Sequence, residues 1–296
     1  MEGFINFLKP PGMTSHDAVG YVRRQLGEKK VGHAGTLDPG AAGVLPVAVG
    51  RATRLIEYFD SVPKAYRAEM VFGFATDSGD DSGKVLERCM DFVMPSKEQL
   101  LAAFQHFSGT ITQVPPAHSA IKINGRRACD LLREGKKVEI PSRLVQIHSL
   151  RLMEVGKKHI VFDVECSKGT YIRSLCTDLG AYLGIPATMS FLVRRAVGEF
   201  SLADSITPEQ LSELKENALL PLDGYLGHLP SYDLEPERLK AFCNGLLTHD
   251  RAFLNERQPA EDVVLRVYCG GQFVGMGHFD VENAAVIPDK VILRQG

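Results

Sequence analysis

The sequence predicts an α+β protein with a small strand-rich part at its C-terminal end. Segments with strand character follow one another across short turns, and helical periods of apolar residues lie between them. The charge is also unevenly distributed. Residues 1–199 hold 26 lysines and arginines against 21 acids, a net charge of +5, whereas residues 200–296 hold 8 against 15, a net charge of −7. Such asymmetry is typical of two domains, one of which binds a polyanion.

The N-terminal elements are a strand at 4–8 and a helix that begins near residue 15. Residues 10–12 are Pro-Pro-Gly, which turns the chain between the two. Thr14 and Asp17 have the spacing of a capping box at the start of a helix. The helix then has an apolar stripe, which we expect to be buried, formed by Ala18, Val19, Val22 and Leu26.

The middle of the chain predicts two hairpins and two helices. A strand at 65–74 is followed by a polar turn at 77–83 and a return strand from Val85. The acids of that turn do not have the spacing of a calcium loop, so no metal site is predicted. A helix follows near 96–107, and strands at 143–155 and 159–167 pair across a turn at 156–158.

A second helix is predicted to start after residue 170, with Arg173 in its first turn. We expect Thr170 to cap it, with Gly184 at its C-terminal end. A cation in the first turn opposes the helix dipole by roughly 0.3 to 1 kcal/mol. Arg173 is therefore either placed for a carboxylate or phosphate, or an incidental exposed arginine.

The C-terminal part predicts a small independent β-rich domain. An acidic helical segment at 208–218 precedes it. From Ser231 onward a helix-like stretch and a turn at Gly245 lead to strands at 263–269, 272–279 and 290–293.

The composition excludes several classes of protein. Hydrophobic residues make up 44% of the chain and charged residues 24%, which is ordinary for a soluble globular protein. No signal peptide and no apolar run of about 18 residues are present, so secretion and membrane insertion are not expected. Six scattered cysteines without metal-ligand spacing indicate reduced thiols in a cytoplasmic protein: Cys89, Cys129, Cys166, Cys176, Cys243 and Cys269.

Residues 32–46 form a run rich in glycine and alanine with a single acid, Asp38, and with no helical or strand period. A stretch so poor in bulky side chains allows close approach of backbone or ligand. Asp-Pro is also a common turn starter, so Asp38 has two interpretations, a turn residue or a catalytic carboxylate. His33 and Thr36 nearby favour the second interpretation without deciding it.

Basic residues gather in the segment 122–143, which is either a solvated helical face or a phosphate-contacting surface. Its cations are Lys122, Arg126, Arg127, Arg133, Lys136, Lys137 and Arg143. A further basic pair, Arg194 and Arg195, falls within a strand-like segment.

Five motifs between residues 3 and 200 resemble the TruB family of tRNA pseudouridine synthases, in the family's order. They are LKPPGMTS (8–15), GHAGTLDPGAAGVLP (32–46), KAY (64–66), PPAHSAIKINGRR (115–127) and CSKGTYIRSL (166–175). Gly40, Ala42 and His118 depart from the residues most associated with their positions, which affects fine loop shape and leaves the chemistry unchanged.

The resemblance implies a pseudouridine synthase fold, in which helices flank a bent, mixed and mainly antiparallel sheet. It implies a catalytic domain at 1–229, with an RNA-clasping insertion at about 115–143, and a PUA-like RNA-binding domain at 230–296. The implied partner is the T arm of tRNA, with no protein partner and a monomeric state.

The implied activity is the isomerisation of uridine 55 in the T loop of tRNA to pseudouridine, which needs no cofactor and no metal. Asp38 matches the catalytic aspartate, and Arg173 matches the arginine that keeps it ionised and oriented. Tyr66 matches the residue that stacks on the flipped uracil, and Leu192 an apolar wall of the pocket. The acid could attack C1′, attack C6 or assist elimination at C2′.

The remaining implied roles concern RNA. His33 matches a histidine that inserts into the T loop when the base is extruded, and Lys9 matches a residue that orders the site. The basic segment from Lys122 to Arg143 is expected to contact phosphates. Two other readings remain: an RNA-folding helper without catalysis, and a glycoside hydrolase, which commonly needs a second carboxylate.

Overall fold

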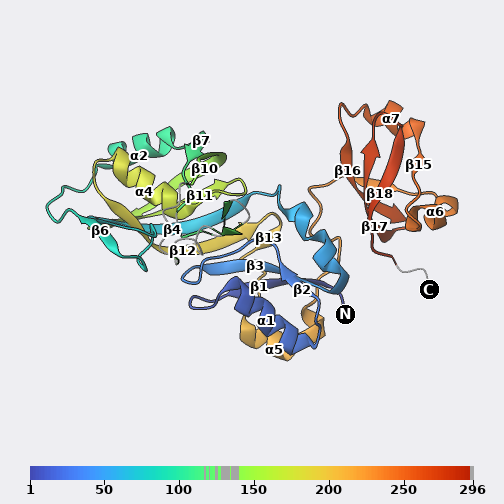
Figure 1. The fold of residues 1–296 in the computed structure, drawn as a ribbon, viewed down its shortest axis with the longest axis horizontal. Coiled ribbons are helices and arrows are strands. Elements are labelled where there is room, and N and C mark those ends of the chain that lie inside the picture. Colours follow the sequence, from blue (N-terminus) through green and yellow to red (C-terminus); the bar gives the residue numbers. More distant parts are fainter. Residues whose placement is uncertain (117, 120, 124–125, 128–133, 135–139, 294–296) are drawn as a thin grey trace.

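The structure, a computed structural model, is built on one large and one small β-sheet, together with two separate two-stranded sheets (Figure 1). It describes all residues except 117, 120, 124–125, 128–133, 135–139 and 294–296. The large sheet contains nine strands: β1 (Gly3–Lys9), β2 (Val31–His33), β3 (Ala42–Val49), β4 (Lys64–Phe72), β7 (Gly109–Gln113), β10 (Arg143–Val155), β11 (His159–Cys166), β12 (Ala187–Val197) and β13 (Phe200–Ser201).

The large sheet is mixed and mainly antiparallel, as predicted. Its main path runs β1-β3-β12-β4-β11-β10-β7, while β2 pairs with β3 and β13 with β12. Only β3 and β12 pair in parallel, through Val193 opposite Ala42 and Arg194 opposite Gly43. The hairpin predicted at 143–155 and 159–167 is present as β10–β11. The return strand from Val85 is present as β6 (Val85–Arg88), but it pairs with the short β5 (Phe74–Thr76), whereas the predicted strand at 65–74 is mainly β4, which pairs with β11 and β12. The α+β prediction is therefore confirmed.

Helices cover this sheet in two groups (Figure 1). The first group, α2 (Lys97–His106) and α4 (Ile172–Tyr182), packs against β4, β10, β11 and β12 through one apolar cluster. The second, α1 (Ser15–Leu26) and α5 (Pro208–Leu214) with the short η2 (Lys215–Ala218), packs against β1 and β3. No helix in the described ranges is long and apolar enough to cross a membrane.

Helix α1 begins and packs as its sequence predicts. The Thr14 hydroxyl accepts a hydrogen bond from the Asp17 amide, and the Asp17 carboxylate accepts one from the Thr14 amide. The four residues of the predicted apolar stripe are all buried. Because the cap fixes where the helix starts, it also fixes Ser15 at the first helical position, pointing toward the loop that carries Asp38.

Two local predictions were wrong. Thr170 does not cap α4: its hydroxyl donates to the Ser167 carbonyl, and Tyr171 occupies the cap position without a side-chain hydrogen bond. Residues 32–46 are not wholly irregular either, because the run includes the end of β2 and the start of β3. Strand β3 is buried on both faces, so it lacks the alternation that marks a half-buried strand.

The C-terminal part forms a second sheet of five strands, in the order β14-β16-β17-β18-β15. These are β14 (Ser231–Asp233), β15 (Thr248–His249), β16 (Val263–Cys269), β17 (Gln272–Asp280) and β18 (Ala285–Val291), with η3 (Pro236–Arg238), α6 (Leu239–Cys243) and α7 (Arg251–Arg257) beside them. The last strand thus begins earlier than the predicted 290–293, and α7 was not predicted.

This second sheet is attached to the 3₁₀ helix η1 (Gly50–Phe59), which follows β3. Arg54 donates to the Val291 carbonyl at 2.6 Å, and Lys290 pairs with Glu57 at 3.1 Å. Ile292 and Met276 join the apolar cluster around Phe59. These contacts link the small sheet to the large one through η1.

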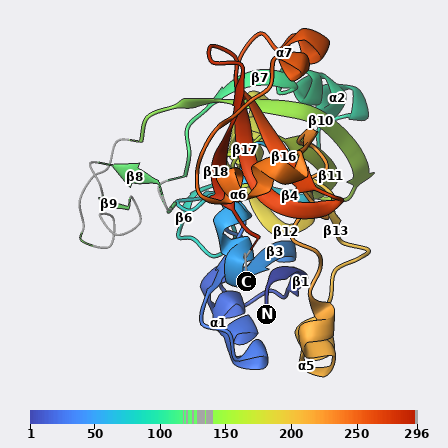
Figure 2. The ribbon, with the colours of Figure 1, turned by 90° about the vertical axis from the view of Figure 1, so that its right-hand side faces the viewer.

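A two-stranded hairpin, β8 (Lys122–Ile123) and β9 (Arg126–Arg127), projects from the body of the molecule (Figure 2). Three residues predicted to contact RNA belong to the strands of this hairpin: Lys122, Arg126 and Arg127. Three others, Arg133, Lys136 and Lys137, lie outside the described residues, as does Cys129. The five described cysteines are free thiols.

Strand β3 reaches β12 only because residue 43 is a glycine. Gly43 has φ +116°, and a Cβ there would lie 2.2 Å from the Arg194 carbonyl oxygen and 2.6 Å from its amide nitrogen. Both atoms are backbone, so neither moves without separating the strands. The parallel pairing that ends beside Asp38 therefore depends on this glycine.

We expect Gly43→Ala to lower the free energy of unfolding by about 2 to 5 kcal/mol, through backbone strain and a backbone clash. The matched control is Gly40→Ala, where φ is not in the left-handed region and nothing lies within 4 Å of the added methyl. The control should change stability by less than about 0.5 kcal/mol. Urea unfolding midpoints of the two variants measure the difference, and equal midpoints would contradict the prediction.

Candidate active site

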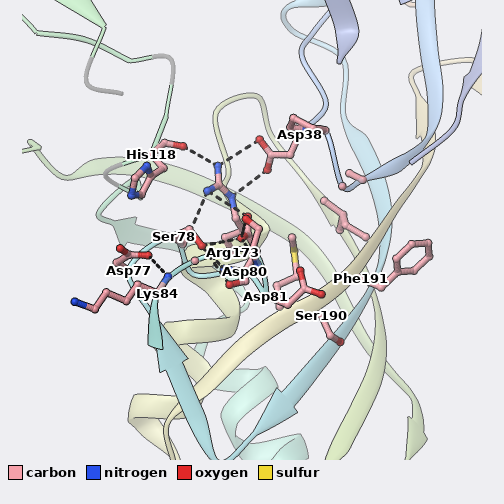
Figure 3. A pocket seen from close by; sticks show the side chains of 17 residues that line it. Asp38, Asp77, Ser78, Asp80, Asp81, Lys84, His118, Arg173, Ser190 and Phe191 are labelled. Atoms are coloured by element: carbon pink, nitrogen blue, oxygen red, sulfur yellow. Dashed lines mark hydrogen bonds and ion pairs between the residues drawn. The ribbon is translucent and has the colours of Figure 1, made fainter. Parts of the chain in front are cut away.

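Two cavities of about 520 and 490 Å³ adjoin beside the loop between β2 and β3. They share four lining residues: Asp38, His118, Arg173 and Leu192. The first, shown in Figure 3, is the acidic cavity, with three further aspartates and one lysine: Asp77, Asp80, Asp81 and Lys84. The second is the cationic cavity, lined also by Lys64, Arg143, Lys168 and Arg194 together with Tyr66 and Tyr171.

Asp38 and Arg173 form an ion pair where the two cavities meet. Arg173 Nη2 donates to Asp38 Oδ1 at 3.3 Å, and Arg173 Nε lies 3.0 Å from Asp38 Oδ2. The arginine side chain is 5% exposed and the aspartate side chain 38% exposed, so the carboxylate faces the cavity while its partner is covered. The prediction that Arg173 faces a carboxylate is confirmed.

The rest of the Arg173 guanidinium binds backbone from two other segments (Figure 3). Its Nη1 donates to the Ser78 carbonyl at 2.9 Å, and its Nη2 donates to the His118 carbonyl at 3.1 Å. Asp80 Oδ2 lies 3.6 Å from Nη1 and adds a second negative charge. Sequence reasoning treated Asp80 only as part of a polar turn, because nothing local indicates a partner 93 residues away.

Burial raises the pKa of Asp38 above its ordinary value. The Arg173 guanidinium opposes that rise, the Asp80 charge adds to it, and Lys9 opposes it weakly. Asp38 is thus a carboxylate whose ionisation depends on its arginine, in a site partly removed from water.

Two side chains hold the backbone of the Asp38 loop from below. The Ser15 hydroxyl accepts from the Leu37 amide at 2.9 Å and donates to the Leu37 carbonyl at 3.1 Å. Lys9, which is fully buried, donates from Nζ to the carbonyls of Pro10, Met13 and Pro39 at 2.9, 2.7 and 3.3 Å. Lys9 therefore orders the loop without lining either cavity.

Tyr66 and Leu192 both line the cationic cavity, from β4 and β12. They are 9% and 6% exposed. Burial raises the pKa of the Tyr66 phenol, an effect that Arg194 opposes, so the hydroxyl keeps its proton at neutral pH. The structure thus brings Asp38, Arg173, Tyr66 and Leu192 together.

His33 stands apart from the two cavities, as Lys9 does. It ends β2, five residues before Asp38, and lines neither cavity. Its Nδ1 is buried and has no hydrogen-bond partner among the described residues. Burial, followed by the Arg194 charge, lowers the pKa of the imidazole, so it is neutral at pH 7.

Arg143, at the start of β10, lines the cationic cavity with its guanidinium 4.8 Å above the Tyr171 ring. It belongs to the cavity wall, whereas Lys122, Arg126 and Arg127 belong to the projecting hairpin. No three His, Cys, Asp or Glu side chains within the described part of the chain are placed to hold a metal ion.

Comparison with known proteins places this site in a family. Residues 23–172 match the model of the N-terminal domain of TruB family pseudouridylate synthases, and residues 173–226 match the C-terminal domain model of tRNA pseudouridylate synthase B. A relative from Clostridioides difficile named tRNA pseudouridine synthase B is 42% identical over 99% of this chain and 100% of its own length. The chain belongs to the TruB family of pseudouridylate synthases. It is therefore an isomerase.

Other TruB relatives give the same result. Proteins with the same name from Moorella thermoacetica and Symbiobacterium thermophilum are 47% and 50% identical over 82% and 78% of this chain, and 82% and 77% of their own lengths. The TruB fold also resembles a solved chain in a Cbf5-Nop10-Gar1 complex, with a TM-score of 0.73, 26% identity, and coverage of 98% of this chain and 84% of that one. The pseudouridine synthase fold is thus confirmed.

The Asp38–Arg173 pair predicts how the activity of this TruB protein depends on pH. An acid needed in its ionised form loses activity as the pH falls through its pKa, and the pKa of Asp38 lies above the ordinary value. In Arg173→Lys a point charge replaces the two-nitrogen contact, so the pKa of Asp38 rises further. We expect the acidic limb of the kcat–pH profile to move to higher pH, by about one unit.

The control is Arg67→Lys. Arg67 binds Asp163 with two hydrogen bonds, at 2.7 and 2.8 Å, and lines neither cavity. Its profile should coincide with that of the unmodified protein. The rate of pseudouridine formation is measured between about pH 5 and 8 for the unmodified protein, Arg173→Lys and Arg67→Lys. If the acidic limb of Arg173→Lys does not move, the titration of Asp38 does not limit the reaction.

Proposed function

We propose that this protein converts uridine 55 in the T loop of tRNA to pseudouridine. The observation that carries the proposal is the Asp38–Arg173 ion pair at the meeting point of two cavities, with Tyr66 on the adjoining wall. The relatives from four organisms that are 42–50% identical are named tRNA pseudouridine synthase B, which supports tRNA as the substrate.

The reaction breaks the N1–C1′ bond of uridine, turns the base and joins C5 to C1′. N1 gains a proton and C5 loses one, so no oxidant, reductant or water is consumed. In the proposed mechanism Asp38 acts as the ionised carboxylate, held by Arg173. Attack at C1′, attack at C6 and elimination at C2′ each begin with the carboxylate beside the sugar and base.

Tyr66 and Leu192 are the proposed contacts of the flipped uracil. Both lie on the wall of the cationic cavity with Asp38, and the phenol ring provides a face on which a base stacks. Because burial keeps the phenol protonated, the hydroxyl acts as a hydrogen-bond donor and not as a phenolate base.

Extruding a stacked base costs a few kcal/mol, which the enzyme has to offset. We assign His33 to the space that the base leaves. Its neutral imidazole carries no desolvation cost of a charge, so it suits insertion between bases. The proposal is supported by the place of His33 at the end of β2, five residues before Asp38 and outside both cavities, so that it does not occupy the space proposed for the uracil.

We expect Asp38→Asn to abolish the release of tritium from tRNA labelled at uridine C5, a loss of at least about 10⁴-fold, because the amide provides neither negative charge nor nucleophile. Binding of tRNA should stay within about threefold, since an asparagine still accepts a hydrogen bond from Arg173. Filter binding and tritium release measure the two quantities.

Asp81→Asn is the matched control, because Asp81 lines the acidic cavity without an ion pair to Arg173 among the described contacts. It should retain tritium release within about threefold of the unmodified protein. Substantial release by Asp38→Asn would rule out the proposed role of Asp38. Binding with no pseudouridine from the unmodified protein would instead indicate an RNA-folding helper, and free uracil would indicate a hydrolase.

The hairpin cations predict a salt effect. If Arg126 and Arg127 bind phosphates, then the double change Arg126→Gln, Arg127→Gln removes two counterion-releasing contacts. The slope of log Kd against log salt concentration should then fall by about 1.4 to 1.8. The comparison is Arg67→Gln, Arg195→Gln, two arginines that share Asp163. Equal slopes in the two double variants would show that Arg126 and Arg127 do not contact RNA phosphates.

A further inference from the structure

Among the residues that the structure describes, Arg194 is the largest side chain that is fully buried, at 1% exposure, and it lines the cationic cavity of the candidate site. Burying a guanidinium is costly unless its hydrogen bonds are satisfied. Within the described residues its partners are backbone carbonyls and a phenol, with no carboxylate among them. The guanidinium thus has hydrogen-bond acceptors but, among the described residues, no negative charge to pair with. A buried cation without a counter-charge calls for an explanation beyond packing.

The guanidinium of Arg194 binds both flanks of the Asp38 loop. Its Nη2 and Nη1 donate to the carbonyls of Gly35 and Thr36, at 3.1 and 3.2 Å, on the side of β2. Its Nε donates to the Val44 carbonyl at 2.8 Å, on the side of β3. One rigid fork thus sets the separation of the two ends of the loop.

The same side chain also faces the tyrosine of the site. Arg194 and Tyr66 are opposite each other in the antiparallel pairing of β12 and β4, and the phenol interacts with the guanidinium. The position of Tyr66 is therefore tied to that of the Asp38 loop through a single residue, although the two come from different strands.

We propose that Arg194 is a positioning residue for pseudouridine formation, which holds the Asp38 loop and the Tyr66 ring in one fixed arrangement. The inference rests on the proposed function for its substrate. Arg194 acts through Asp38 and Tyr66, and it is not assigned a contact with the reacting atoms. A misplacement of about 1 Å in such a pair is enough to cost about 100-fold in rate.

The adjacent Arg195 provides a natural contrast. The strand has a register shift between Arg194 and Ala196, and Arg195 lies on the other side of the sheet, where Asp163 and Arg67 are. It is 46% exposed and pairs with Asp163 at 2.7 Å. The two arginines share a strand and a charge, but only Arg194 contacts the loop and the tyrosine.

The fixed charge of Arg194 gives a second, independent readout. The titratable groups that sense it are Tyr66, His33, Lys64 and Lys9. Burial is the main reason that the pKa of His33 is lowered, and the Arg194 charge lowers it further. Removal of that charge should therefore raise the pKa of His33, whereas a lysine at the same position keeps the charge and should leave that pKa unchanged. The titration of His33 thus separates loss of the charge from loss of the two-sided contact with the loop.

The experiment compares Arg194→Met, Arg194→Lys and the control Arg195→Met in the full-length protein. For each variant, kcat on a transcribed tRNA, Kd for that tRNA and the melting temperature are measured. The titration of His33 is followed by NMR, with His33→Gln to assign its signal. The unmodified protein is tested in parallel for modification at uridine 55.

We expect Arg194→Met to lower kcat by about 100-fold with Kd within about threefold, and to raise the pKa of His33. Arg194→Lys should keep the pKa of His33 at its value in the unmodified protein, because the charge is retained. Its kcat should exceed that of Arg194→Met by less than tenfold, because one ammonium does not span both flanks of the loop. Arg195→Met should match the unmodified protein in all four quantities.

Three results would overturn the inference. The first is a folded Arg194→Met with kcat within threefold of the unmodified protein. The second is a folded Arg194→Lys with the kcat of the unmodified protein. This result provides the test if Arg194→Met does not fold. The third is failure of both variants to fold, which would make the role of Arg194 purely structural. If the unmodified protein leaves uridine 55 unchanged but modifies another uridine, the proposed site is wrong while the kcat comparison still tests Arg194.

Discussion

The candidate active site depends on buried cations that hold the loop carrying Asp38 in place. The loop from Gly35 to Ala41 has too few large side chains to pack itself in place, so apolar burial alone does not fix its shape. Lys9 from β1 and Arg194 from β12 bind its backbone carbonyls, and Arg173 from α4 binds the Asp38 carboxylate. Their charge-assisted hydrogen bonds are stronger than neutral ones, and they come from elements that the large sheet already fixes.

In this arrangement the buried cations fix the conformation of the Asp38 loop and lower the folding stability of the protein. Burial lowers the pKa of Lys9 to about 8, a sign that the ammonium is held in an unfavourable environment. An apolar core at the same place would be more stable, but it has no donors to bind carbonyls. Small residues around Asp38 then serve a purpose: they leave the carboxylate open to a ligand, while the polar contacts beneath it keep the backbone from adapting.

Much of the fold was predictable because it follows local rules. The capping box of α1 and the hairpin β10–β11 needed only a few neighbouring residues. Family motifs singled out Asp38, Tyr66 and Arg173 as candidates, and all three line the cationic cavity. What was missed depends on distant partners. Nothing near Arg194 in the sequence distinguishes it from Arg195, and only the parallel pairing of β3 with β12 brings it beneath the loop. The assignment of Thr170 as a cap failed because its hydroxyl found the Ser167 carbonyl instead.

The charges of the two cavities impose a direction on any bound nucleotide. Asp77, Asp80 and Asp81 gather on one side of the Asp38–Arg173 pair, and Lys64, Arg143 and Arg194 on the other. Two unit charges 4 Å apart interact by about 4 kcal/mol near a protein surface, so a phosphate among the aspartates would be opposed by several kcal/mol. In the proposed function, the nucleotide backbone therefore follows the cationic side, and the sugar edge of the flipped uridine meets Asp38 from that side. In that proposal the carboxylate is approached from the cavity whose wall also carries Tyr66, the proposed stacking residue.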